Sequence, residues 1–83
     1  MTRQEILMSV RQFVAGHFII APGKTLADDE SLLGSGVLDS IGFMTLITHL
    51  EKQFQIGFLD TELGAENVDS ISRLADFISK KLP

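Results

Sequence analysis

The sequence has no cysteine among its 83 residues. This absence excludes a disulfide scaffold and thiolate chemistry in the chain itself, so the fold must rest on packing alone. The sequence also has no apolar run of membrane-spanning length, and its first residues run into amphipathic sequence that does not resemble a signal peptide. We therefore expect a cytoplasmic protein with no membrane insertion.

Positively charged residues are scarce, because 7 Lys and Arg stand against 11 Asp and Glu, for a net charge of −4. Phosphate binding needs a concentrated basic surface, so this balance disfavours a nucleic-acid ligand. Hydrophobic residues make up 45% of the chain, which is enough for a globular fold. The length predicts a single domain, residues 1–83, and so small a domain rarely encloses a deep catalytic pocket. The composition favours a module that binds or carries other molecules over an enzyme.

Apolar residues recur at helical spacing in three segments, which predicts three amphipathic helices. The first covers residues 3–18, the second covers residues 40–55, and the last begins near residues 69–70. The predicted buried stripes are Ile6, Val10, Phe13, Val14 and Phe18 in the first, Phe43, Leu46, Ile47, Leu50 and Phe54 in the second, and Ile71, Leu74, Ala75, Ile78 and Leu82 in the last. Gly57 is a suitable terminator for the second helix.

A short helix is predicted between the second and the last, at residues 61–65, with Asp60 as its cap. Residues 21–38 form a long connection with a charged run that we interpret as solvated, Asp28-Asp29-Glu30. The connection also carries apolar residues that we expect to pack on the helices, namely Leu26, Leu32, Leu33, Val37 and Leu38. The predicted fold is an all-α four-helix bundle with a long loop between helices 1 and 2 and a short third helix.

The end of the long loop joins a glycine-rich turn to a helix start. Gly34 and Gly36 can take the positive φ angles that other residues resist. Asp39 and Ser40 are residue types preferred at helix starts, where their side-chain oxygens accept hydrogen bonds from free backbone N–H groups. The sequence thus places a hydroxyl beside a carboxylate at the beginning of a helix.

The tripeptide Asp-Ser-Ile occurs twice, at residues 39–41 and 69–71, so the local string does not identify a site. Ser40 follows the long loop and has enough chain after it to build a surface around it. Ser70 is followed only by the last helix. We therefore interpret Ser70 as a helix cap and Ser40 as the candidate functional residue.

Ser40 lacks the neighbours that a hydrolase nucleophile needs, which are a base, an orienting acid and an oxyanion hole. His49 lies about 13 Å along the same helix at 1.5 Å per residue, too far for a hydrogen bond with Ser40. The acidic run lacks the ligand spacing of a calcium loop, and Gly34-Ser35-Gly36 lacks the lysine of a phosphate-binding loop. We expect no catalytic and no metal-binding residue. The remaining interpretation is that another enzyme modifies Ser40. The start of a helix suits this role because it favours an attached phosphate.

The stretch Gly36-Val37-Leu38-Asp39-Ser40-Ile41, in this order of helices, resembles the acyl and peptidyl carrier proteins. Members of that family carry 4′-phosphopantetheine, derived from coenzyme A, on a serine that opens the second helix of a four-helix bundle. The resemblance implies that Ser40 is the attachment site and that the transferase recognises Asp39. It also implies a carrier that holds acyl or aminoacyl thioesters and catalyses nothing itself.

The resemblance further implies a set of partner enzymes for a monomeric, stand-alone carrier. These are a phosphopantetheinyl transferase, a loading ligase, adenylation enzyme or acyltransferase, and downstream acceptor or synthase enzymes. Residues 40–55 hold a single acid, Glu51, unlike the acidic second helix of fatty-acid carriers. The sequence therefore resembles aminoacyl carriers, including D-alanyl carriers, and free-standing peptidyl or polyketide carriers more than fatty-acid carriers. Docking is expected to rely on Leu38, Ile41, Met44, Thr45 and Thr48.

An alternative interpretation needs no modification. In it the chain is a helical docking module, and Ser40 is only the cap of its helix. This alternative predicts that replacing Ser40 by alanine costs about 1 kcal/mol of stability and changes nothing else.

Overall fold

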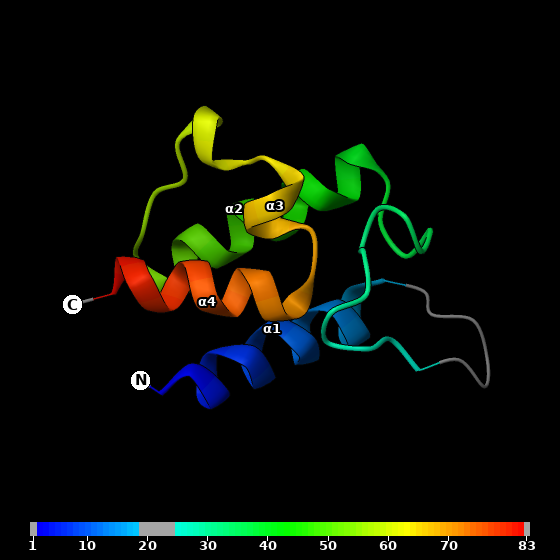
Figure 1. The fold of residues 1–83 in the computed structure, drawn as a ribbon, viewed down its shortest axis with the longest axis horizontal. Helices are drawn as coiled ribbons and strands as arrows, with labels where there is room; N and C mark the ends of the chain where they lie inside the picture. The colour runs from blue at the N-terminus through cyan, green and yellow to red at the C-terminus, as the bar shows by residue number, and fades with distance from the viewer. Residues whose placement is uncertain (1, 19–24, 83) are drawn as a thin grey trace.

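The computed structural model describes residues 2–18 and 25–82. Within these ranges the chain forms helices and turns and no strand, which confirms the prediction of an all-α fold. Helix α1 spans Arg3–His17, α2 spans Ser40–Phe54, and α4 spans Ile71–Lys81. A 3-10 turn at Asp60–Glu62 and the one-turn helix α3 at Ala65–Val68 lie between α2 and α4. The described part of the chain thus has three helices longer than ten residues, and α4 packs against both α1 and α3 (Figure 1).

Helix α1 begins where its sequence supplies a capping box. The backbone N–H of Glu5 donates to the Thr2 hydroxyl at 3.2 Å, and the Thr2 N–H donates to the Glu5 carboxylate at 2.8 Å. Ile6, Val10 and Val14 are buried as the periodicity predicts, together with Leu7. Phe13 and Phe18 are only partly buried.

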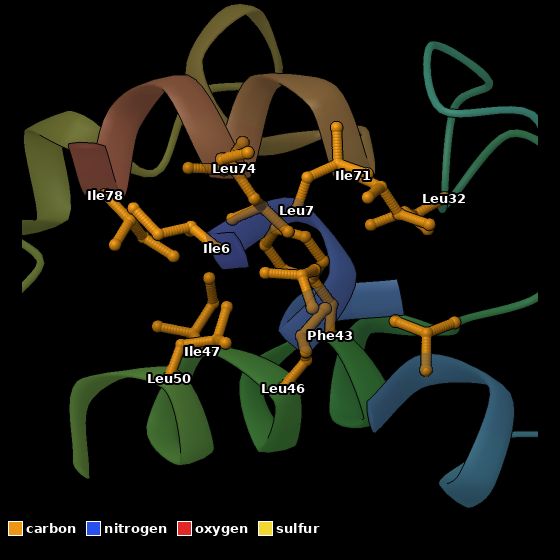
Figure 2. Packing of buried hydrophobic residues seen from close by; sticks show 14 of the residues in the cluster. Ile6, Leu7, Leu32, Phe43, Leu46, Ile47, Leu50, Ile71, Leu74 and Ile78 are labelled. Carbon is orange, nitrogen blue, oxygen red and sulfur yellow. The ribbon is translucent and has the colours of Figure 1, made fainter. Parts of the chain in front are cut away.

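Helix α2 is capped by Asp39, whose carboxylate accepts a hydrogen bond from the Gly42 N–H at 2.7 Å. The five residues predicted as its stripe are its buried residues. Of these, the labelled Phe43, Leu46, Ile47 and Leu50 point toward α1 and α4 in Figure 2. The end of α2 agrees with the predicted bound at residue 55, but the prediction of Gly57 as its terminator is wrong. Gln55 takes the left-handed conformation at φ 55° and ends the helix, two residues before Gly57.

The segment between α2 and α4 also differs from the prediction of one short helix at residues 61–65. It is split into the 3-10 turn and α3, and Leu59 rather than Asp60 precedes the 3-10 turn. The Leu59 N–H donates to the Glu62 carboxylate at 2.8 Å, and Gly64 lies between the two pieces. Because α3 is a single turn, the predicted four-helix bundle is not established by the described elements.

The hydrophobic core lies where the three long helices and the loop before α2 meet. Figure 2 shows side chains of α1, α2 and α4 converging, with Leu32 of the loop closing one end. Helix α4 contributes the predicted residues Ile71, Leu74, Ala75 and Ile78, while Leu82 is partly buried. Among the described helices none is long and apolar enough to cross a membrane.

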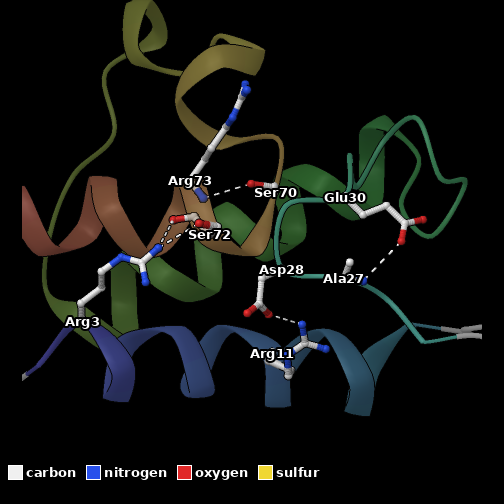
Figure 3. A network of polar contacts seen from close by, with 8 residues as sticks. All are labelled: Arg3, Arg11, Ala27, Asp28, Glu30, Ser70, Ser72 and Arg73. Atoms are coloured by element: carbon white, nitrogen blue, oxygen red, sulfur yellow. Dashed lines mark hydrogen bonds and ion pairs between the residues drawn. The ribbon is translucent and has the colours of Figure 1, made fainter.

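The loop of residues 25–39 is fixed to the start of α4 and to α1. Asp28 forms an ion pair with Arg11 (Figure 3). The Asp28 carbonyl accepts from the Ser72 N–H at 2.8 Å. The Glu30 carboxylate accepts from the Ala27 N–H at 3.3 Å. The expectation that the acidic run is merely solvated is therefore wrong for Asp28 and Glu30.

Three loop leucines, Leu26, Leu32 and Leu38, are at most 3% exposed, which confirms that the loop packs on the helices. Leu33 is 42% exposed, contrary to expectation, and it is held by its backbone, whose N–H donates to the carboxylate of Asp69 at 3.0 Å. Val37 packs partly against the core. The loop therefore delivers the chain to Ser40 along a defined path.

Candidate functional site

The candidate site begins at Ser40, the first residue of α2. Its side chain is exposed, and within residues 2–18 and 25–82 its hydroxyl makes no hydrogen bond. Asp39, not Ser40, supplies the capping oxygen, so the interpretation of Ser40 as only a helix cap is wrong. An unbonded hydroxyl at the positive end of a helix is accessible to a modifying enzyme, and this position favours an attached phosphate.

Ser70, the serine of the second Asp-Ser-Ile copy, has the opposite environment. It is 2% exposed, and its hydroxyl oxygen accepts from the Arg73 N–H at 3.0 Å (Figure 3). The neighbouring Asp69 carboxylate accepts from the Ser31 hydroxyl and from the Leu33 N–H. This confirms Ser70 as a cap, and its burial keeps it away from any modifying enzyme.

Two glycines shape the approach to Ser40, for different reasons. Gly36 has φ +80°, as predicted, and a side chain there would be strained although the space is open. Gly34 does not have a positive φ, so that expectation is wrong. A Cβ at Gly34 would instead lie 2.8 Å from the Ser31 oxygen, which donates to Asp69 and accepts from the Gly34 N–H.

An open groove, here called the α1–α2 groove, starts at Ser40 and follows the exposed side of α2. Its α2 wall consists of Ser40, Ile41, Met44, Thr45, Thr48 and Lys52. These positions recur every three or four residues, so helical spacing alone could have identified this wall. Ile41 is 80% exposed and Met44 is 48% exposed, so both side chains of this wall reach solvent.

The other wall of the groove contains aromatic rings from both helices. Phe13 of α1 stacks on His17 with ring centroids 4.0 Å apart and on His49 of α2 at 3.7 Å. His49 Nε2 lies 2.9 Å from the Gln53 side chain, and His17 Nδ1 lies 3.0 Å from the Phe13 carbonyl. Neither imidazole is bonded to Ser40. Sequence analysis missed this ring cluster because the stacking depends on how α1 and α2 pack, and no local pattern reports it.

Leu38 does not belong to the exposed surface, contrary to its predicted docking role. It is 3% exposed and packs in the core, so it cannot contact a partner in the folded chain. Its N–H donates to the Leu32 carbonyl at 3.2 Å, which closes the loop just before the Asp39 cap. Leu38 therefore positions Asp39 and Ser40. The docking role of Ile41, Met44, Thr45 and Thr48 stays a prediction.

Two carboxylates of the described chain have clearly shifted pKa values, and both lie away from Ser40. The backbone N–H and hydroxyl of Thr2 lower the pKa of Glu5. The Lys81 ammonium, 2.8 Å away, and the Leu59 N–H lower the pKa of Glu62. In the described part of the chain no three His, Asp or Glu side chains gather as metal ligands.

Comparison with known proteins agrees with this geometry. Residues 10–78 match the protein family described as "Phosphopantetheine attachment site". The D-alanyl carrier protein of Streptococcus uberis is 35% identical over 52 residues, which cover 63% of this chain and 66% of the relative. That of Streptococcus suis is 41% identical over 46 residues, which cover 55% and 58%. These matches span less than two thirds of either relative.

A solved structure of an acyl carrier protein from Enterococcus faecalis has a similar fold. The TM-score is 0.74 and the sequence identity is 28%, with 98% of this chain and 99% of that chain covered. The similarity therefore extends over almost the whole chain, including the order of helices on both sides of Ser40.

Proposed function

The chain belongs to the phosphopantetheine-attachment family, and we propose that Ser40 is the residue that carries its 4′-phosphopantetheine group. The family carries this group covalently, and its members are carriers that other enzymes load and unload. The thiol at the end of the group holds an acyl or aminoacyl cargo as a thioester. The chain itself supplies the attachment oxygen and the surfaces that its partners contact.

The observation that carries this proposal is the contrast between the two serines. The Ser40 hydroxyl is exposed and unbonded among the described residues, whereas the Ser70 hydroxyl is buried and caps α4. In the transfer, Ser40 Oγ forms the phosphodiester bond, its proton passes to a base of the transferase, and the adenosine bisphosphate part of coenzyme A leaves. The start of α2 favours the negative charge of the product.

Asp39 and the α2 wall are the proposed contacts for partner enzymes. One Asp39 oxygen accepts from the Gly42 N–H, and the exposed carboxylate remains accessible to the transferase. The exposed, nearly uncharged face at Ile41, Met44, Thr45 and Thr48 fits docking by apolar contact. We propose a loading ligase, adenylation enzyme or acyltransferase and a downstream acceptor or synthase as these partners.

The relatives guide the proposed pathway. Resemblance to the D-alanyl carriers of two streptococci supports an aminoacyl or acyl cargo on a stand-alone, monomeric carrier. The similar fold of the Enterococcus faecalis protein supports the interpretation of α3 as the short third helix of a four-helix carrier bundle.

Intact mass spectrometry tests the attachment site. The apo protein is incubated with coenzyme A, Mg²⁺ and a broad-specificity phosphopantetheinyl transferase. We expect one phosphopantetheine group to be added to the parent protein and none to Ser40→Ala. Ser70→Ala is the matched control, with folding checked by circular dichroism, and it should accept one group. An adduct on Ser40→Ala, or none on the parent, would contradict the proposal.

A further inference from the structure

The loop before α2 is closed into a turn, residues 32–38, which ends two residues before Ser40. The Leu38 N–H donates to the Leu32 carbonyl at 3.2 Å, so the first and last residues of this turn are joined at its base. Both leucines are at most 3% exposed and pack in the core. The position of Leu32 therefore helps to set that of Leu38, which is followed directly by the Asp39 cap and by Ser40.

The base of the turn is held by Asp69, a residue far away in the sequence that precedes the cap of α4. The Leu32 N–H donates to the Asp69 carbonyl at 3.2 Å, and the Leu33 N–H donates to one oxygen of the Asp69 carboxylate at 3.0 Å. The other carboxylate oxygen accepts from the Ser31 hydroxyl. Two of these three hydrogen bonds are made by a charged group, and such bonds are stronger than neutral ones.

Ser31 extends this anchor further into the turn. Its hydroxyl donates to Asp69, and the same oxygen accepts from the Gly34 N–H at 2.8 Å. A Cβ at Gly34 would lie 2.8 Å from that oxygen, so this contact requires glycine. Ser31 and Asp69 are both half-buried, so water replaces these hydrogen bonds only in part when one partner is removed. The two side chains thus satisfy two backbone N–H groups of the turn and join it to the start of α4.

We propose that Asp69, together with Ser31, is a positioning residue for the modification of Ser40. This inference rests on the proposed function and adds to it two residues outside the attachment motif. Among the described residues no hydrogen bond joins either of them to Ser40, so both act through the turn. The transferase has to bind Ser40 in one arrangement of the turn and the helix start. When the turn also takes other arrangements, the apparent affinity falls by the fraction of chains that are competent to bind.

Priming kinetics test this role, with intact mass as the readout, saturating coenzyme A and the concentration of the apo protein varied. Circular dichroism first establishes that each variant is folded under the assay conditions. We expect Asp69→Ala and Ser31→Ala each to raise the KM for the apo protein at least about threefold and to change kcat by less than about twofold, because the loss precedes binding. Asp76→Ala is the matched control. It removes an α4 carboxylate that pairs with Arg3 of α1 and not with the loop, so it should keep the parental KM.

Amide hydrogen exchange measures the turn itself and needs no priming. The Leu38 N–H bonds to Leu32 and not to Asp69, so we expect its exchange in Asp69→Ala to accelerate more than that of Leu46 in the core of α2, which reports global unfolding. Equal acceleration of the two amides would overturn the inference. So would parental KM values for Asp69→Ala and Ser31→Ala, or an equal rise in Asp76→Ala. Absence of priming in the parent would instead contradict the proposed function.

Discussion

The carboxylate of Asp69, at the start of α4, accepts a hydrogen bond from the hydroxyl of Ser31 in the loop before α2. The same carboxylate accepts from the Leu33 N–H at 3.0 Å, and the Asp69 carbonyl accepts from the Leu32 N–H at 3.2 Å. One acidic residue therefore fixes the loop at three consecutive residues. Because that loop ends at Ser40, the second Asp-Ser-Ile copy helps to position the first.

Asp69→Ala should destabilise the fold, because it removes a charged acceptor from two donors. Hydrogen bonds to charged groups contribute about 1.5–3 kcal/mol each, and part of this is recovered by water at a half-buried site. We expect the free energy of unfolding in urea to fall by about 1–3 kcal/mol. Asp29→Ala is the control, since Asp29 is exposed and has no partner among the described residues. It should stay within about 0.5 kcal/mol of the parent.

Gly36→Ala should also destabilise the chain, by strain of the backbone alone. Nothing lies within 4 Å of the added Cβ, but φ is +80°, and a side chain in a left-handed conformation costs about 1–2 kcal/mol. Gly57→Ala is the matched control, because its surroundings are equally open and its φ is not positive. We expect Gly57→Ala to be neutral or to stabilise by about 0.4–1 kcal/mol. Equal urea midpoints for the two variants would contradict this account.

The helices that carry a long apolar stripe could be predicted from the sequence. In α2 the spacing of Phe43, Leu46 and Leu50 determines which side faces the core, and the structure buries that side. The cap role of Ser70 could also be predicted, since only the last helix follows it in the chain. These features are local or depend only on chain order.

Features that depend on packing could not be predicted. An apolar loop residue such as Leu38 or Leu33 has no periodic neighbours, so its burial is decided by the helices that it meets. The left-handed conformation of Gln55 at the end of α2 has no local signal, because Gly57, two residues later, is the more suitable residue type. The stack of Phe13 on His49 joins residues on different helices and is visible only when α1 lies beside α2.

Acid should weaken the ion pair between Glu62 of the 3-10 turn and Lys81 of α4. Lys81 and the Leu59 N–H lower the pKa of Glu62 in the folded chain. The unfolded chain therefore binds a proton at this site at a higher pH than the folded chain does. The stabilisation is present above the ordinary glutamate pKa of about 4.3 and is lost as pH falls through the folded value.

Glu62→Gln tests this pH dependence, because it removes the titrating group and keeps the size of the side chain. We expect the urea midpoint of the parent to decline more steeply below about pH 4.3 than that of Glu62→Gln. Asp29→Asn removes a carboxylate without a partner among the described residues and should keep the slope of the parent. Parallel declines for the parent and Glu62→Gln would show that the Lys81 contact does not persist in solution.

Ser40→Ala should lose priming and keep its stability, whereas Ser70→Ala should keep priming and lose stability. The Ser40 hydroxyl has no hydrogen-bond partner in the described chain, so its loss should change the free energy of unfolding by less than about 0.5 kcal/mol. The Ser70 hydroxyl caps α4, and its loss should cost about 1 kcal/mol. Urea denaturation of both variants measures this difference. A cost of about 1 kcal/mol for Ser40→Ala would restore the interpretation of Ser40 as a cap.

Asp39 combines a structural contact with a proposed recognition role, and two substitutions separate them. Asp39→Ala removes both the cap of α2 and the charge, while Asp39→Asn keeps an oxygen that can accept from the Gly42 N–H. We expect the free energy of unfolding to fall by about 1 kcal/mol in the alanine variant and to change little in the asparagine variant, because Asn and Asp cap helices about equally well. Both variants should be primed more slowly than the parent if the transferase reads the carboxylate, as intact mass against time will measure. Priming of Asp39→Asn at the parental rate would mean that Asp39 serves only to begin α2 and that recognition of Ser40 depends on other residues.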